Sequence, residues 1–219
     1  MEDRMRNRGS ETKRKPRALK SYILMAGLGC LAGILTRLTD FFPYDSLWSL
    51  SSIATLFGFW MVTVTLVVLF SRSNRNAAVN VMLYLTAMNI SLYLLKYILG
   101  LFLPMFDNEG FHWNLLALYT ALACLCSIGG FVLYFWNKGG SPGSFLYGLP
   151  IGGLGAETVA VGIYLFHNKT FLFQFLFDLA GMAAIGYVFW KKAENKILYT
   201  GTAVVVAAAG YFCFYRLFL

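Results

Sequence analysis

Apolar residues fill most of the chain in seven long runs, which short polar segments separate. Each run approaches or exceeds the ~20 helical residues that a bilayer core requires. The pattern predicts an all-α, polytopic transmembrane helix bundle of about seven spans over 21–219, preceded by a polar tail over 1–20. The runs occupy 21–39, 47–70, 78–103, 112–136, 144–166, 169–190 and 197–217. The connections are too short to hold a soluble domain.

Composition supports this interpretation. Apolar and aromatic residues make up 58% of the 219 residues, and charged residues make up 13%, against about 25% in ordinary soluble domains. So few charges cannot coat a soluble domain of this length. The composition therefore excludes a soluble globular domain, a disordered chain, a fibrous chain and a disulfide scaffold.

The basic residues predict the topology. If the N-terminus is cytoplasmic, eight Lys and Arg residues lie inside in the tail, two after the second run, one after the fourth and three after the sixth. That arrangement places 14 of the 18 basic residues inside and three outside, and the remaining one is Lys96 within a span. Because inner loops of membrane proteins are enriched in Lys and Arg, we expect a cytoplasmic N-terminus and an external C-terminus in the cell membrane.

The tail carries much of the net charge of +8, because residues 1–20 hold eight basic and three acidic residues. It lacks apolar periodicity and interleaved aromatic residues, so we expect it to be disordered and to contact the anionic lipids of the bilayer. RNA binding and docking of a partner protein are the alternatives. Of these two alternatives, we keep a membrane protein as a partner and do not expect a nucleic acid.

The fifth run is unusually rich in helix-breaking residues. It contains Pro150 and five glycines, which lower helix propensity and favour a kinked or partly unwound segment in the interior of the bundle. Two interpretations remain open: the glycines serve close helix packing, as the Gly29 and Gly33 pair in the first run suggests, or they mark a functional break.

Ionisable residues at membrane depth are the candidate site. Such residues cost about 2.5–3.5 kcal/mol each on insertion scales and usually face a partner or a wet cavity. Helix rise places all four candidates in the outer half of the bilayer. They are Lys96, Glu157, Asp178 and, near the outer end of the first run, Arg37.

Polar residues extend this candidate site along two helix faces. Asn89, Tyr93 and Lys96 recur at spacings of three and four, and Gln174 lies four residues before Asp178. Residues at these spacings share one face of a helix. We expect the two stripes to meet around an outward-opening cavity that binds a ligand. The alternative is a buried ionic cluster that only fixes helix register.

Motifs for catalysis and metal binding do not support an enzyme. The sequence contains no H-E-x-x-H and no G-x-S-x-G, and its four cysteines form no C-x-x-C pattern. His112 and His167 both fall at the outer boundary. We expect no cofactor and no metal.

Several short apolar stretches resemble the N-terminal half of small, uncharacterised bacterial multi-pass membrane proteins. The similarity covers about residues 25–100 and carries no specific motif. It implies an integral bacterial membrane protein and no particular activity. The stretches are Gly33-Ile34-Leu35-Thr36, Ser46-Leu47-Trp48-Ser49-Leu50, Phe57-Gly58-Phe59-Trp60-Met61 and Ala87-Met88-Asn89.

Two classes of function follow from these observations. The first hypothesis is a small transporter or permease-like subunit that binds its ligand among the outer-half charges. The second is a non-catalytic accessory or immunity-type partner protein, and an intramembrane enzyme ranks third. A wet pocket lined by the charges favours transport, whereas directly paired charges in a dry bundle favour the accessory function.

Overall fold

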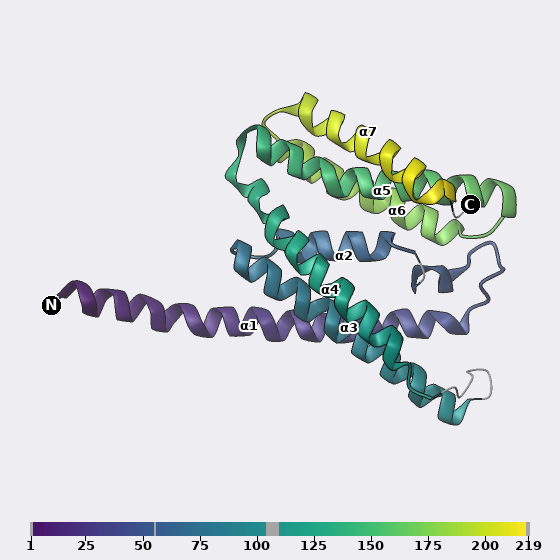
Figure 1. The fold of residues 1–219 in the computed structure, drawn as a ribbon, viewed down its shortest axis with the longest axis horizontal. Helices are drawn as coiled ribbons and strands as arrows, with labels where there is room; N and C mark the ends of the chain where they lie inside the picture. The colour runs from purple at the N-terminus through teal and green to yellow at the C-terminus, as the bar shows by residue number, and fades with distance from the viewer. Residues whose placement is uncertain (1, 55, 104–109, 218–219) are drawn as a thin grey trace. The chain divides into compact units, whose positions relative to one another are not determined.

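The structure, a computed structural model, describes residues 2–54, 56–103 and 110–217, and within these ranges it contains helices and no strand. The all-α prediction is confirmed (Figure 1). The α-helices are α1 (Glu2–Leu38), α2 (Gly58–Leu69), α3 (Asn74–Phe102), α4 (Trp113–Leu133), α5 (Gly140–Asn168), α6 (Leu172–Lys192) and α7 (Lys196–Cys213). Four short 3-10 helices join them: η1 (Thr39–Phe41), η2 (Leu50–Ala54), η3 (Tyr134–Lys138) and η4 (Tyr215–Leu217).

Six helical segments in the described part of the chain are long and apolar enough to cross a membrane. Their mean hydropathies lie between 1.4 and 2.1. The chain is a multi-pass membrane protein. The six segments are Leu19–Phe41, Asn74–Phe102, Trp113–Lys138, Gly140–Asn168, Leu172–Lys192 and Lys196–Cys213.

The remaining apolar run, 47–70, differs from the single span that its composition predicts. Its helical part is α2, with 12 residues, and the preceding part contains only the 3-10 turn η2. Twelve residues reach about 18 Å at 1.5 Å each, whereas the bilayer core is about 30 Å thick. The described part of the second run is therefore not one continuous helix of spanning length.

From Glu2 onward, the basic segment 1–20 belongs to the first helix of the structure. Helix α1 begins at Glu2 and runs without interruption into the first apolar run. Glu, Arg, Lys and Met, which are frequent in this segment, all have high intrinsic helix propensity. A helix that the apolar run nucleates can therefore extend toward the N-terminus.

The helices fall into two compact units. The first comprises Met1–Ile34 and Ser71–Phe131. Within it, Gly29 and Gly33 bring α1 against the backbone of α3: an added Cβ on Gly29 would lie 2.9 Å from the carbonyl carbon of Tyr84, and one on Gly33 would lie 3.1 Å from that of Met88. This close approach agrees with a packing role for the Gly29 and Gly33 pair.

The second unit comprises Leu35–Phe70 and Val132–Leu219, and α5 is at its centre. Helix α5 lies beside α6 and α7 (Figure 1) and also contacts α2. It is one continuous α-helix through Pro150, and half of its apolar window is buried, more than in any other described span. The interior position is as predicted. The expected unwinding is absent, because tight packing on α7 holds the helix.

The glycines of α5 explain that packing. A Cβ added to Gly148 would lie 2.8 Å from the Tyr199 carbonyl oxygen, and one added to Gly152 would lie 2.8 Å from that of Ala203. Both distances are shorter than real Cβ contacts, so only glycine permits this approach. Of the two interpretations of the fifth run, the structure supports close helix packing. The interrupted helix lies in the second run instead.

Helix α7 gives the topology a direct test. It is a single span of 18 residues, or about 27 Å at 1.5 Å per residue. Reporter proteins fused after Leu219 and inserted at Lys191 should therefore report opposite sides of the membrane, with the Lys191 site in the cytoplasm. If both reporters lie on the same side of the membrane, the predicted topology is wrong.

Candidate functional site

Two carboxylates and one amide are fully buried where α5, α6 and α2 meet. Glu157 comes from α5, and Gln174 and Asp178 come from α6, one turn apart. All three have a relative exposure of 0%. Asp and Glu are almost never fully buried unless paired, because ions lose much of their solvation energy on leaving water. The hydrogen-bond partners of this acid pair therefore need to be identified.

Glu157 is well supplied with donors. Its Oε1 accepts a 2.8 Å bond from the backbone N–H of Gly58, the first residue of α2. Its Oε2 accepts a 2.7 Å bond from the hydroxyl of Tyr215 in η4. The amide Nε2 of Gln174 lies 3.5 Å from Oε1 and adds a long third contact. Donors of this kind replace the water that a buried carboxylate loses.

Asp178 is only half satisfied. Its Oδ1 accepts a 2.8 Å bond from Gln174 Nε2. Its Oδ2 and the Gln174 carbonyl oxygen Oε1 are buried and have no hydrogen-bond partner among the described residues. The site thus holds two acceptor oxygens with unused lone pairs, which is costly unless a cation or a proton fills them.

The interruption of the second run supplies positive potential to the acid pair. Because α2 begins at Gly58, its unpaired N–H groups and the positive end of its dipole face Glu157. The N-terminus of a helix carries about half a positive charge. An added Cβ on Gly58 would overlap the Asp178 carboxylate and lie 2.8 Å from Gln174 Nε2. Only glycine lets the helix end approach both acids.

The chain before α2 is a serine-rich, largely non-helical segment that reaches the start of α6. The Leu172 N–H donates to the Leu47 carbonyl (3.0 Å), and η2 contacts α6 and α2. Ser49 and Ser52 in this segment are buried, and the buried Ser51 Oγ has no partner among the described residues. Irregular backbone at membrane depth persists only where protein covers it or water reaches it.

The structure brings together part of the predicted ionic cluster. Glu157 and Asp178 lie at one site, where Gln174 Nε2 is within hydrogen-bonding distance of both carboxylates. Arg37, at the end of α1, forms an ion pair with Asp40. In the second unit, neither Glu157 nor Asp178 forms an ion pair with a Lys, Arg or His among the described residues.

The other predicted site residues belong to the first unit. Asn89 and Tyr93 are buried on α3, and the Tyr93 ring lies 6.1 Å from that of Tyr119 on α4. Lys96, one turn further, is half-buried. It forms no ion pair with the described residues of that unit. Pairing of Lys96 with Glu157 or Asp178, and an outward-opening cavity between the two stripes, stay predictions.

Sequence reasoning missed two members of the site. Tyr215 follows the last span, and Gly58 lies inside an apolar run, so neither carries a local signal for a role beside Glu157. The pair Phe57-Gly58 offered a weak hint, because a glycine within an apolar run often marks a close backbone approach.

The donor atoms of the site are all oxygens. The described residues contain no group of three or more His, Cys, Asp or Glu side chains placed to hold a metal ion. The acid pair offers two carboxylates and one amide oxygen. Such oxygen donors are hard ligands, which suit hard cations better than the soft metal ions that thiolates bind.

The Tyr215 hydroxyl gives the site a simple mutational test. We expect Tyr215→Phe to lower the free energy of unfolding by about 1.5–3 kcal/mol, the usual range for a hydrogen bond to a charged group. Tyr211→Phe is the matched control, because Tyr211 forms no hydrogen bond with the residues that the structure describes and lies in the same terminal region. Thermal unfolding in detergent measures both. Equal melting temperatures for the two variants would mean that Tyr215 does not stabilise Glu157.

Comparisons with known proteins do not assign the chain to a family. No family model, curated protein or solved structure matches the chain. The function must therefore be inferred from the site itself.

Proposed function

We propose that the protein is a small membrane transporter or permease-like subunit that carries a proton or an alkali cation through the site formed by Glu157, Gln174 and Asp178. The observation that carries this proposal is the unused acceptor pair, Asp178 Oδ2 and Gln174 Oε1, in a site with no exposed surface. Operation in a bacterial cell membrane stays a prediction from the sequence.

The charge of the site supports a cationic ligand. Two carboxylates lie together, and within their unit no described basic side chain neutralises them. The helix dipole offsets only part of this charge, about half a unit. A bound proton or cation neutralises the remainder and gives the free oxygens a partner. Ionisable residues of this kind inside membranes mark ion pathways and proton relays.

The interrupted second run supports transport over a purely structural role. Transporters commonly build their ion sites from discontinuous helices, in which a half-helix end faces the ligand at membrane depth. Here the half-helix α2 directs its N-terminus at Glu157. The serine-rich segment before α2 provides polar groups between the site and the Leu47–Leu172 contact. That segment is the route by which we expect the ion to enter.

Reconstitution into liposomes tests the proposal. Purified protein is incorporated into vesicles that contain a pH-sensitive dye, and a proton, Na⁺ or K⁺ gradient is then imposed. We expect the wild-type protein to dissipate at least one of these gradients. Glu157→Gln and Asp178→Asn should reduce the flux to that of protein-free vesicles, because each removes a carboxylate from the ion site.

Glu194→Gln is the matched control, since Glu194 is an exposed acid in the loop between α6 and α7. It should transport as the wild type does. Flux that is unchanged in Glu157→Gln and Asp178→Asn, or that falls equally in Glu194→Gln, would overturn the proposal.

The accessory function remains the second candidate, and one observation bears on it. Acids that only fix helix register are expected to use their hydrogen-bonding capacity fully, because each unpaired buried acceptor costs about 1–3 kcal/mol. The free oxygens of Asp178 and Gln174 disfavour that role. Absence of flux for all three ions, with a folded wild-type protein in the vesicles, would favour the accessory function.

A further inference from the structure

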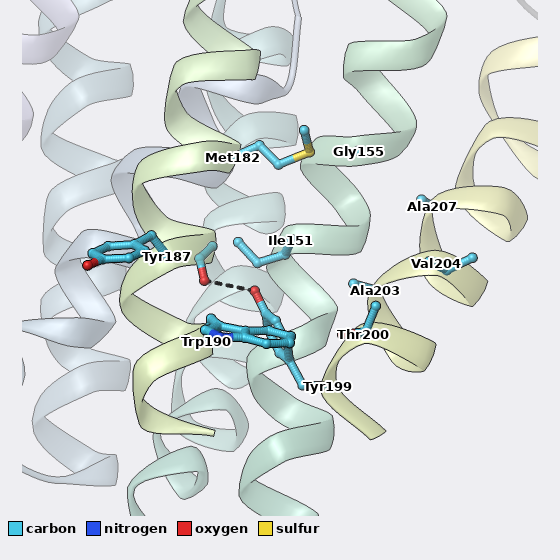
Figure 2. Close-up of a pocket in the computed structure, with 11 residues that line it drawn as sticks. Ile151, Gly155, Met182, Tyr187, Trp190, Tyr199, Thr200, Ala203, Val204 and Ala207 are labelled. Atoms are coloured by element: carbon cyan, nitrogen blue, oxygen red, sulfur yellow. Dashed lines mark hydrogen bonds between the residues drawn. The ribbon is translucent and has the colours of Figure 1, made fainter. Parts of the chain in front are cut away.

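An apolar groove runs along the outside of the second unit, between α5, α6 and α7 (Figure 2). Its volume is about 480 Å³, within the range of small-molecule sites. Small residues hollow it: Gly155 on α5, Gly186 on α6, and Ala203 and Ala207 on α7. The stretch from Tyr199 to Ala207 covers about 12 Å of helix at 1.5 Å per residue.

Aromatic side chains line one end of the groove. Figure 2 shows Trp190 and Tyr199 there, with Met182 and Gly155 toward the other end. The Tyr199 hydroxyl donates a 3.0 Å bond to the Gly186 carbonyl and fixes the ring. Tyr187 and Trp190 remain 61% and 45% exposed. The groove therefore opens toward the lipid and ends at side chains that prefer the membrane interface.

Two ammonium groups lie over aromatic side chains that line the groove. Lys191 Nζ is 4.4 Å from the centre of the Tyr187 ring, and Lys196 Nζ is 5.1 Å from that of Trp190. Lys196 also donates to the Trp190 carbonyl. The one acid of this loop, Glu194, has its carboxylate beside Gly139. Positive charge therefore gathers where the apolar groove meets the interface.

We propose that the groove binds an anionic phospholipid, with one acyl chain along the small residues of α7 and the phosphate at Lys191 and Lys196. Charge complementarity selects this occupant: an acyl chain alone fills the apolar part, but only a ligand with an anionic head group uses the two ammonium groups at its end. A transmembrane helix in the same groove gains nothing from these lysines. The sequence also assigns this end to the cytoplasmic leaflet, where anionic lipids are concentrated.

Native mass spectrometry of the full-length protein tests the site. The protein is released from mild detergent with phosphatidylglycerol or phosphatidylcholine of equal chain length, and retained lipid is counted across a titration. We expect preferential retention of phosphatidylglycerol. Lys191→Ala combined with Lys196→Ala should weaken that retention about thirtyfold, since each lysine near a membrane surface contributes about fivefold.

Lys138→Ala is the matched control, because Lys138 Nζ also lies over an aromatic ring, 4.4 Å from the centre of Phe135, but Phe135 does not line the groove. Ala203→Phe provides an independent arm: it fills the groove, keeps both lysines and should lower retention of long-chain phosphatidylglycerol. The basic N-terminal tail is intact in every variant, so lipid held there does not change.

Three results would overturn the proposal. The first is equal retention of phosphatidylcholine, and the second is a loss in the double lysine variant no larger than in Lys138→Ala. The third is a dimer that Ala203→Phe dissociates while phosphatidylglycerol retention stays the same, because the groove would then be an interface between two copies. If Ala203→Phe fails to fold, the exposed double lysine variant alone decides.

Discussion

Gly58→Ala should destabilise the protein by about 3 kcal/mol, at the upper end of the usual cost of overpacking. The added Cβ overlaps the Asp178 carboxylate and lies 2.8 Å from Gln174 Nε2. Both neighbours are completely buried, so they cannot rotate into solvent. The shift that relieves the clash also draws the Gly58 N–H away from Glu157. Thermal or SDS-induced unfolding in detergent measures the loss.

Gly201→Ala is the control for this substitution. Gly201 lies in α7, and an added Cβ there meets nothing within 4 Å. Alanine in a helix is more favourable than glycine by up to about 1 kcal/mol, so the control should be neutral or stabilising. Asp178→Ala combined with Gly58→Ala should recover part of the lost stability, because it removes the overlapping carboxylate. If Gly58→Ala is as stable as Gly201→Ala, the N-terminus of α2 does not approach the acid pair.

Most of the spanning helices can be predicted from the sequence, because hydropathy measures how favourably a segment transfers from water to lipid. Six of the seven apolar runs form helices of spanning length, and α5 is interior, as its small residues predict. The run at 47–70 was misjudged because hydropathy does not measure backbone continuity. Its outer part is apolar enough to lie in a membrane, yet its repeated serines, such as Ser49 and Ser52, bond to the local backbone and compete with a helix.

The candidate site was predictable only in part. Glu157 and Asp178 stood out because ionisable residues are rare at membrane depth, and helix rise gave them similar depths. Their donors did not stand out, because the contacts of Glu157 with Gly58 and Tyr215 join residues 99 and 58 positions apart in the chain. Arg37 was drawn into the predicted cluster by its charge, whereas its partner is Asp40, three residues away.

The two acids are chemically unequal although they share one site. Glu157 accepts from a helix N-terminus and from a tyrosine hydroxyl, so its ionised form is stabilised by donors that the fold holds in place. Asp178 has one amide donor and one free oxygen. In the proposed transport function, a cation or proton that enters the site finds its unfilled acceptor on Asp178 and Gln174. Glu157 then supplies the fixed negative charge, and Asp178 is the exchanging group.

This inequality predicts stability changes of opposite sign for the two isosteric substitutions. In Asp178→Asn, an amide donor replaces a free acceptor oxygen beside a second free acceptor, Gln174 Oε1, and a buried charge is removed. We expect a gain of about 1–2 kcal/mol in the free energy of unfolding. In Glu157→Gln, the charge-assisted bonds from Gly58 and Tyr215 are weakened, and we expect a loss of about 1.5–3 kcal/mol.

Both variants are unfolded under the same conditions as the wild type, and neither variant should transport. If Asp178→Asn stabilises the protein and abolishes transport, the carboxylate of Asp178 serves ion binding rather than the stability of the fold. If Asp178 is instead paired with Lys96, Asp178→Asn strands the lysine and lowers stability by about 3–5 kcal/mol. The sign of that single measurement therefore separates an exchanging ion site from a buried ion pair.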